Sequence, residues 1–350
     1  MRSIAQSTST LPMEPVSTQG LKVCWIRSEC ANFSDPLLAH AGFHFQKTYF
    51  PLGFPLSIAT NSQLVLEAAD QSWGTFKQLF SRTPIRLEIG ITAAESPFCP
   101  PAPVGRMRKH LLSNVADGEN FAVSDLSEGC SIIWATDAAL HHPDYFRYFL
   151  LESAAMVQIA ARHATGIHAG CVALGERGVL LCGDSGAGKS TLSYACARAG
   201  WTYVTDDGSY LVNDRSDRLV VGNCAQVRFR PSAETLFPEL HGLSVVQRVR
   251  AGKPSLELPT DSQTAISTAM TANIKHIVFL KRHVNTQEIV PFPREVARLY
   301  MQQRVHCLPH RVAEQMASID RLLETEILEI RYNELDWAIG ELSQLVLEGR

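Results

Sequence analysis

The segment from Gly183 to Ser190 reads GDSGAGKS and matches the pattern G-x-x-x-x-G-K-[ST]. The apolar run GVLLC at 178–182 precedes it, and a helical pattern over 190–199 follows it and ends at Gly200. Glycines allow backbone N–H groups to approach phosphate oxygens, and the N-terminus of the next helix adds positive potential. The strand–loop–helix order therefore predicts a binding loop for a nucleoside triphosphate.

Two side chains at the end of this loop have distinct expected roles. Lys189 supplies a cation for the β- and γ-phosphates, and Ser190 supplies a hydroxyl ligand for Mg²⁺. A glycine-rich turn that binds nothing is the alternative, and the motif alone does not separate a kinase from an ATPase, a GTPase or a switch. The expected nucleotide-binding residues here are Gly183, Asp184, Ser185, Gly186, Ala187, Gly188, Lys189, Ser190 and Thr191.

An acidic pair and one histidine flank the loop in the sequence. Asp206 and Asp207 end the strand-like run 201–205, where one carboxylate suits metal binding and the other suits proton transfer. Asp207-Gly208 also fits a hairpin turn between two strands. His168 lies in the apolar stretch 166–170, where a histidine is more often structural.

The composition is that of a globular protein, with 45% hydrophobic and 19% charged residues among 350. A formal net charge of -3 argues against nucleic-acid binding, and no run approaches the ~20 apolar residues that span a bilayer. The nine cysteines contain no C-x-x-C pair. We therefore expect free thiols, a cytoplasmic location and no nucleic-acid or membrane partner.

The chain is expected to divide into three parts. Residues 1–20 are polar and indicate a partly disordered lead-in, 21–145 a smaller mixed α/β domain, and 146–350 an α/β domain that contains the nucleotide-binding loop. The four prolines of 95–104 predict a loop. The remaining patterns predict strands at 121–123, 130–134, 167–174, 178–181, 201–205, 210–212, 274–280 and 327–330, and helices at 144–163, 190–199, from 294 to 303, at 311–323 and at 335–347.

The stretch from His168 to Asp207 resembles the HPr kinase/phosphorylase family, whose catalytic domain has the phosphoenolpyruvate-carboxykinase-like P-loop fold. The shared pattern is a strand with histidine, a second strand, the G-x-S-G-x-G-K-S loop, a helix and a strand ending in Asp-Asp. PFPRE at 291–295 and YNELDWA at 332–338 are more similar to HPr-kinase-related ATP-binding proteins of bacteria. That wider group includes kinases that act on peptides.

The resemblance implies a role for each matching residue. Lys189 would contact the transferred phosphate, Asp207 would accept the proton of the acceptor hydroxyl, and His168 would orient the acidic group. Asp206 would support the Mg²⁺ shell with Ser190, and Arg228 would meet phosphate. The sequence departs from the family pattern at Gln226, where the family has a metal-binding glutamate, and no register makes the nearby Glu234 that ligand. Arg230 is a second, weaker candidate for phosphate, and a plain surface charge is the alternative for both Arg228 and Arg230.

The reading that combines these features is a Mg²⁺- and ATP-dependent kinase that phosphorylates a serine hydroxyl of a protein or peptide. Two alternatives remain: a kinase for a small-molecule hydroxyl, and a nucleotide-binding regulatory module without activity. The missing glutamate favours the regulatory module, whereas His168 and Asp207 favour an enzyme. The acceptor is not identified by the sequence, and a homo-oligomer is left open.

Overall fold

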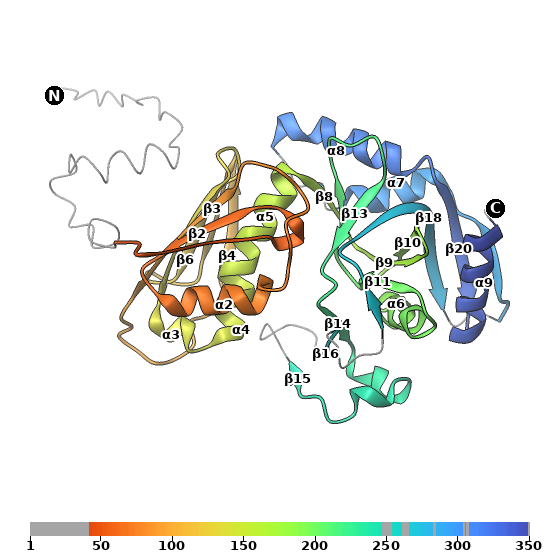
Figure 1. Cartoon of the computed structure of the whole chain (residues 1–350), viewed down its shortest axis with the longest axis horizontal. Coiled ribbons are helices and arrows are strands. Elements are labelled where there is room, and N and C mark those ends of the chain that lie inside the picture. Colours follow the sequence, from red (N-terminus) through yellow and green to blue (C-terminus); the bar gives the residue numbers. More distant parts are fainter. Residues whose placement is uncertain are drawn as a thin grey trace, which may run out of the picture. The chain divides into compact units, whose positions relative to one another are not determined.

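The computed structural model describes residues 42–246, 254–260, 266–282, 285–303, 305 and 308–348. The expected polar lead-in at 1–20 lies outside these residues. From Phe43 onward the chain forms one compact unit of helices and mixed β-sheets, so the chain is α/β (Figure 1). A domain boundary at 145/146 stays a prediction.

The first sheet has seven strands in the order β1-β2-β3-β7-β6-β5-β4. Its central strands β2, β3 and β7 are parallel, and the outer pairs are antiparallel. Buried and partly buried residues alternate along β2, which is the period-2 pattern of a strand packed on one face. The strands are β1 Phe45–Tyr49, β2 Leu56–Thr60, β3 Ile85–Thr92, β4 Val104–Arg108, β5 Leu111–Val115, β6 Phe121–Asp125 and β7 Cys130–Thr136.

Two predictions for this region are confirmed. The strands expected at 121–123 and 130–134 are β6 and β7, joined by a turn in which Gly129 has φ +67°. Residues 95–103 form no helix or strand. The helix expected at 144–163 is a continuous helical segment whose middle is a π-helix, the rarer form with wider turns. The helices are α2 Gln63–Trp73, α3 Asp137–Leu140, α4 Pro143–Tyr145, a π-helix Phe146–Glu152 and α5 Ser153–Arg162, with a 3₁₀ turn at Pro51–Gly53.

The second sheet has ten strands and contains the parallel neighbours β10, β18 and β20. The apolar run 167–174, expected as one strand, is divided. Ile167 ends β8, which pairs with β12, and Ala169 begins β9, which pairs with β10. The strands are β8 Ala164–Ile167, β9 Ala169–Leu174, β10 Arg177–Cys182, β11 Thr202–Thr205, β12 Ser209–Val212, β13 Leu219–Gly222, β17 Ser267–Thr268, β18 Thr271–Arg282, β19 Glu288–Pro291 and β20 Glu326–Tyr332.

Helices pack against both faces of this sheet. Val179 and Leu181 belong to a buried cluster with residues of α6 and α9, whereas Leu180 and Cys182 belong to a cluster with residues of α7 and α8. A strand buried on both faces needs apolar residues at consecutive positions, which explains the run GVLLC. The predicted helices are confirmed as α6 Lys189–Arg198, α7 Arg294–Gln302, α8 Pro309–Leu322 and α9 Leu335–Glu348.

A small antiparallel sheet completes the described fold beside α6. Its order is β14-β16-β15, and its apolar residues pack with Tyr194 of α6 in a separate cluster. Its strands are β14 Gln226–Phe229, β15 Val245–Val246 and β16 Ser255–Pro259, with 3₁₀ turns at Pro231–Thr235 and Pro238–Leu240.

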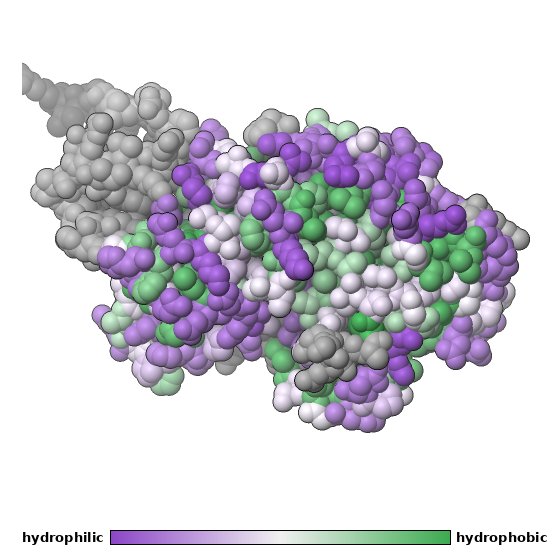
Figure 2. Space-filling view, in the orientation of Figure 1, coloured by the Kyte–Doolittle hydropathy of each residue, from purple (hydrophilic) through white to green (hydrophobic). Residues whose placement is uncertain are grey.

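The surface is mixed in polarity. Figure 2 shows hydrophilic residues over much of one face, with smaller hydrophobic areas between them. Within the described part of the chain, the helices are too short or too polar to cross a bilayer.

Candidate nucleotide-binding site

The G-x-x-x-x-G-K-S segment forms a loop between β10 and α6, as its sequence context predicts. The loop contains three glycines with positive φ, a backbone conformation that other residues rarely adopt: +144° at Gly183, +96° at Gly186 and +99° at Gly188. Gly188 immediately precedes Lys189, the first residue of α6. The loop therefore presents backbone amides and a helix N-terminus at the carboxyl end of a central strand, where α/β sheets bind ligands.

The Lys189 side chain is buried against the backbone of the loop. It is 6% exposed, and its Nζ donates to the carbonyl oxygens of Gly183 at 2.7 Å and Asp184 at 3.2 Å. The same Nζ lies 2.9 Å from Nε2 of His168. The lysine predicted from the motif and the histidine 21 positions before it are thus direct neighbours.

His168 joins Lys189 to the acidic pair. Its Nδ1 lies 3.1 Å from Oδ1 of Asp207, whose side chain is 58% exposed. An ammonium group only donates hydrogen bonds, so Nε2 of a neutral His168 accepts from Lys189 and Nδ1–H donates to Asp207. This arrangement holds the Asp207 carboxylate in place while leaving it exposed to solvent.

Asp206 is buried, in contrast to its neighbour. It is 7% exposed, accepts from the Tyr203 hydroxyl at 3.1 Å and from the Arg228 backbone N–H at 3.2 Å, and is also hydrogen-bonded by Ser190. Burial raises the pKa of Asp206 to about 6; the nearby Asp207 also raises it, and these hydrogen bonds oppose the shift.

The pairing of β11 and β12 excludes a hairpin turn at Asp207-Gly208, which was the alternative interpretation of the acidic pair. β11 pairs with β9 and β17, whereas β12 pairs with β8 and β13. Asp207-Gly208 therefore does not close a hairpin between these two strands.

The side chains of Ser190 and Asp206 are suitable protein ligands for Mg²⁺. Mg²⁺ commonly takes one or two protein ligands and completes its octahedron with phosphate oxygens and water. Asp206 is a buried carboxylate whose hydrogen-bond donors are neutral groups, so a divalent cation would compensate its charge. A cluster of three or more histidine, cysteine or acidic ligands is absent from the described residues.

A cavity of about 580 Å³ contains these groups and extends toward β14. Arg228 lines it, but its guanidinium is paired with Glu257 at 3.2 Å and donates to Ser255 at 3.0 Å. Gln226, where the resemblance would place a glutamate, accepts a hydrogen bond from the Tyr203 hydroxyl at its backbone carbonyl oxygen and does not line the cavity. Glu234 does not line it either.

Three residues near the loop were not predicted as site residues. Tyr300 of α7 hydrogen-bonds to the backbone of Gly183 and His168. Arg230 donates to the Ser185 hydroxyl at 3.2 Å, and Arg282 of β18 lines the cavity. All three lie far from the motif in sequence and are brought to it by strand pairing and helix packing. The segment QVRFR at 226–230 drew attention to Arg230, whereas no local pattern identifies Tyr300 or Arg282.

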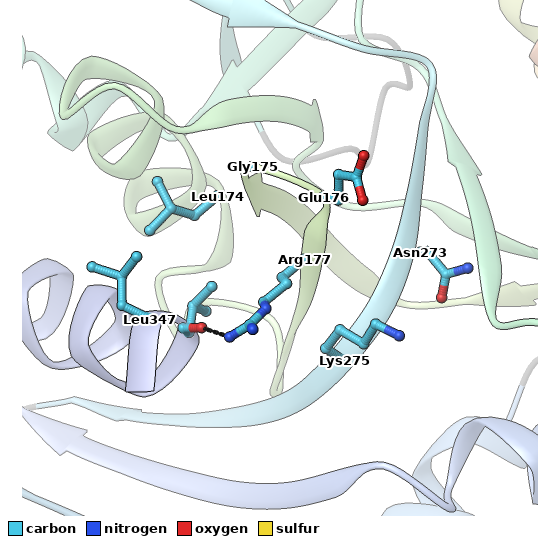
Figure 3. A pocket seen from close by; sticks show the side chains of 8 residues that line it. Leu174, Gly175, Glu176, Arg177, Asn273, Lys275 and Leu347 are labelled. Atoms are coloured by element: carbon cyan, nitrogen blue, oxygen red, sulfur yellow. Dashed lines mark hydrogen bonds between the residues drawn. The ribbon is translucent and has the colours of Figure 1, made fainter. Parts of the chain in front are cut away.

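A second cavity, of about 670 Å³, lies at the opposite end of β10 (Figure 3). Its lining includes Lys275 and Asn273 of β18 and Arg177, which donates to the carbonyl oxygen of Val346 near the end of α9. Although larger, it is at the amino end of β10, away from the loop and the acidic pair. We therefore place the candidate site at the smaller cavity.

No family model matches the chain, and neither does any curated protein. Among solved structures, the HPr(Ser) kinase/phosphatase from Coxiella burnetii is similar at a TM-score of 0.27 and 13% identity, covering 52% of this chain and 98% of the other. A likeness at this level carries no conclusion about activity.

Proposed function

We propose that the protein is a Mg²⁺- and ATP-dependent kinase that transfers the γ-phosphate to a serine hydroxyl of a protein or peptide. The hydrogen-bonded series Lys189–His168–Asp207, beside a phosphate-binding loop, is the observation that supports this proposal most directly. A loop that only bound nucleotide would have no need of an accessible carboxylate held in place by an imidazole.

Each residue has a chemical task in this reaction. The acceptor hydroxyl oxygen forms a bond to the γ-phosphorus, the bond to the β–γ bridging oxygen breaks, and ADP leaves. Asp207 takes the hydroxyl proton on a carboxylate oxygen, with His168 fixing its orientation. Lys189 exchanges its contacts with the Gly183 and Asp184 carbonyls for phosphate oxygens and stabilises the negative charge there.

Metal binding in this proposal uses Ser190 and Asp206. Bound Mg²⁺ would neutralise charge on the β- and γ-phosphates. Tyr203 and the Arg228 backbone hold the Asp206 carboxylate in position through their hydrogen bonds. The sequence resemblance to HPr-kinase-related proteins supports ATP as the donor and serine as the acceptor.

The exposure of Asp207 favours a large acceptor over a small molecule, because this carboxylate, although it lines the cavity, is 58% exposed to solvent. The second candidate is a nucleotide-binding regulatory module. It is favoured by Gln226, since the amide replaces the expected carboxylate and lies outside the cavity lining.

The test is transfer of labelled γ-phosphate from ATP, with Mg²⁺, into size-fractionated extract of the native cell. Wild-type protein is compared with K189A, D207N and D144N, the last changing an exposed aspartate in α4. Label in a discrete protein or peptide with wild type and D144N, absent with K189A and D207N, is the expected result. Label only in small molecules would identify a small-molecule kinase. Nucleotide binding without any labelled acceptor would favour the regulatory module.

A further inference from the structure

The adjacent parallel strands β18 and β20 each end in a polar residue that has no role in the proposed reaction. Arg282 is the last residue of β18 and Tyr332 the last of β20, and the two are paired in register. Cys182, the last residue of β10, pairs with Phe279. β18 therefore continues three residues beyond β10, roughly 10 Å of extended chain, and runs beside the phosphate-binding loop.

Both side chains reach the loop at Gly188. A Cβ placed on Gly188 would lie 2.7 Å from Cδ of Arg282, 3.1 Å from the hydroxyl oxygen of Tyr332 and 3.4 Å from Nη1 of Arg282. Arg282 also lines the same cavity as Lys189 and Ser190. The pair thus forms a wall of the cavity directly against the last glycine of the loop.

Neither group has its hydrogen bonds satisfied. Nε of Arg282 and the hydroxyl of Tyr332 are buried atoms with no hydrogen-bond partner among the described residues. Tyr332 is 1% exposed, and burial raises its pKa to about 12 while the charge of Arg282 opposes that shift. Buried polar groups without partners are costly, so a ligand that supplies an anionic acceptor at this point would be favoured.

The strand order separates this pair from the reacting groups. In the sequence of neighbours β11-β9-β10-β18, with β20 beside β18, Asp206 and Asp207 follow β11 and His168 precedes β9. Arg282 and Tyr332 end the strands on the other side of β10. A nucleotide whose γ-phosphate faces Asp207 therefore extends its remaining phosphates toward Arg282.

We infer that Arg282 and Tyr332 form a subsite for the phosphates that are not transferred, so that they bind ADP as well as ATP. This inference rests on the proposed nucleotide site. Arg282 supplies a charge-assisted hydrogen bond, which is stronger than a neutral one, and Tyr332 donates its hydroxyl hydrogen to the same phosphate chain. They bind and position the nucleotide and take no part in proton transfer.

The test is calorimetric binding of ADP with Mg²⁺, and separately of pyrophosphate, to the full-length protein. R282M keeps a side chain against Gly188 without the charge, and Y332F removes only the hydroxyl. We expect R282M to weaken ADP binding about tenfold or more and Y332F about threefold to tenfold, with similar losses for pyrophosphate. K281A is the matched control, because Lys281 is an exposed cation one position earlier whose side chain points to the opposite face of β18.

The outcomes separate the two proposals. If wild-type protein does not bind ADP, or if K189A binds it equally well, the proposed nucleotide site is wrong. If wild type binds ADP but R282M binds it with the same affinity, the nucleotide site stands and Arg282 is only structural. A loss confined to ADP, with pyrophosphate unaffected, would show contact with the nucleoside and would also overturn this subsite. Thermal unfolding of each variant checks that the fold is retained.

Discussion

The hydroxyl of Tyr300 accepts a hydrogen bond from the backbone N–H of Gly183 at 3.0 Å, at the point where β10 leads into the glycine-rich loop 183–188. The same hydroxyl lies 2.6 Å from the carbonyl oxygen of His168 and 2.8 Å from that of Gly183. One side chain from α7 therefore fixes the start of the loop relative to the histidine that contacts Lys189. Its ring packs edge-on against Phe279, which holds the tyrosine in place.

Y300F should lower phosphoryl transfer about tenfold, since hydrogen bonds of about 1 kcal/mol each would no longer hold the loop and His168 together. The ring packing remains, so the fold should be kept. Y145F is a suitable control because the Tyr145 hydroxyl bonds the Pro101 carbonyl, away from the loop. Equal rates for Y300F and Y145F in the labelled-phosphate assay would contradict the positioning role.

The acidic pair should separate into two functions when each member is changed to asparagine. D207N should lower the rate about a hundredfold or more and leave ADP binding intact, because it removes the proton acceptor. D206N should instead raise the Mg²⁺ concentration that gives half-maximal activity by about tenfold or more. Titration of activity against Mg²⁺ distinguishes the two, and identical behaviour of the variants would show that the proposed division of roles is wrong.

G188A should both destabilise the protein and impair nucleotide binding. Alanine at φ +99° is strained by about 1–2 kcal/mol, and its Cβ would also displace Arg282 and Tyr332. G200A is the matched variant, because Gly200 has φ +95° and no atom within 4 Å of the added Cβ. Chemical denaturation should show a larger loss for G188A, and ADP binding should be lost in that variant alone. Equal losses of stability with normal ADP binding would contradict this account.

His163 should make stability depend on pH. It stacks on Phe54 with ring centroids 5.1 Å apart, and its Nε2 is buried with no hydrogen-bond partner in the part of the chain that the structure describes. Burial, aided by the charges of Arg162, Arg82 and Arg311, lowers its pKa to about 4. Between pH 6.5 and pH 4 the unfolded chain therefore binds more protons, so stability falls as the pH is lowered.

The expected loss from His163 between pH 7 and pH 4 is on the order of 2 kcal/mol. H163F keeps the stacked ring but cannot titrate, so its unfolding free energy should fall less over this range. H141Q, at an exposed histidine, should follow the wild-type curve. Denaturant unfolding at several pH values measures the difference, and parallel curves for wild type and H163F would refute the assignment.

Local patterns predicted much of the second half of the chain. The strand before the loop, helix α6 and the strand before Asp206 are all defined by short runs of apolar residues and glycines, and each lies close to its expected bounds. The helices α7, α8 and α9 were predicted for the same reason. Hydrophobic periodicity depends only on neighbours in sequence, so these elements can be predicted without knowledge of tertiary contacts.

The pairing of strands that are distant in sequence could not be predicted in this way. Nothing in the run 167–174 shows that its first residue belongs with β12 and the rest with β10. Arg282 and Tyr332 become neighbours through parallel pairing of strands that are separated by helices α7 and α8. The order of the first sheet likewise depends on which buried faces meet, and the sequence of 43–136 contains no motif that specifies it.

Strand β18 is paired along its length with β13, β10 and β20, and residues 276–280 are buried without interruption. Its amide protons there should exchange with solvent only when the sheet as a whole opens, so this strand should be among the slowest to exchange in the described chain. This strand ends in Arg282, whose side chain lies against Gly188 of the loop. The residue that contacts the loop therefore belongs to a strand that should seldom open. In the proposed nucleotide site, Arg282 would therefore be a contact whose position changes little between the empty and the loaded protein.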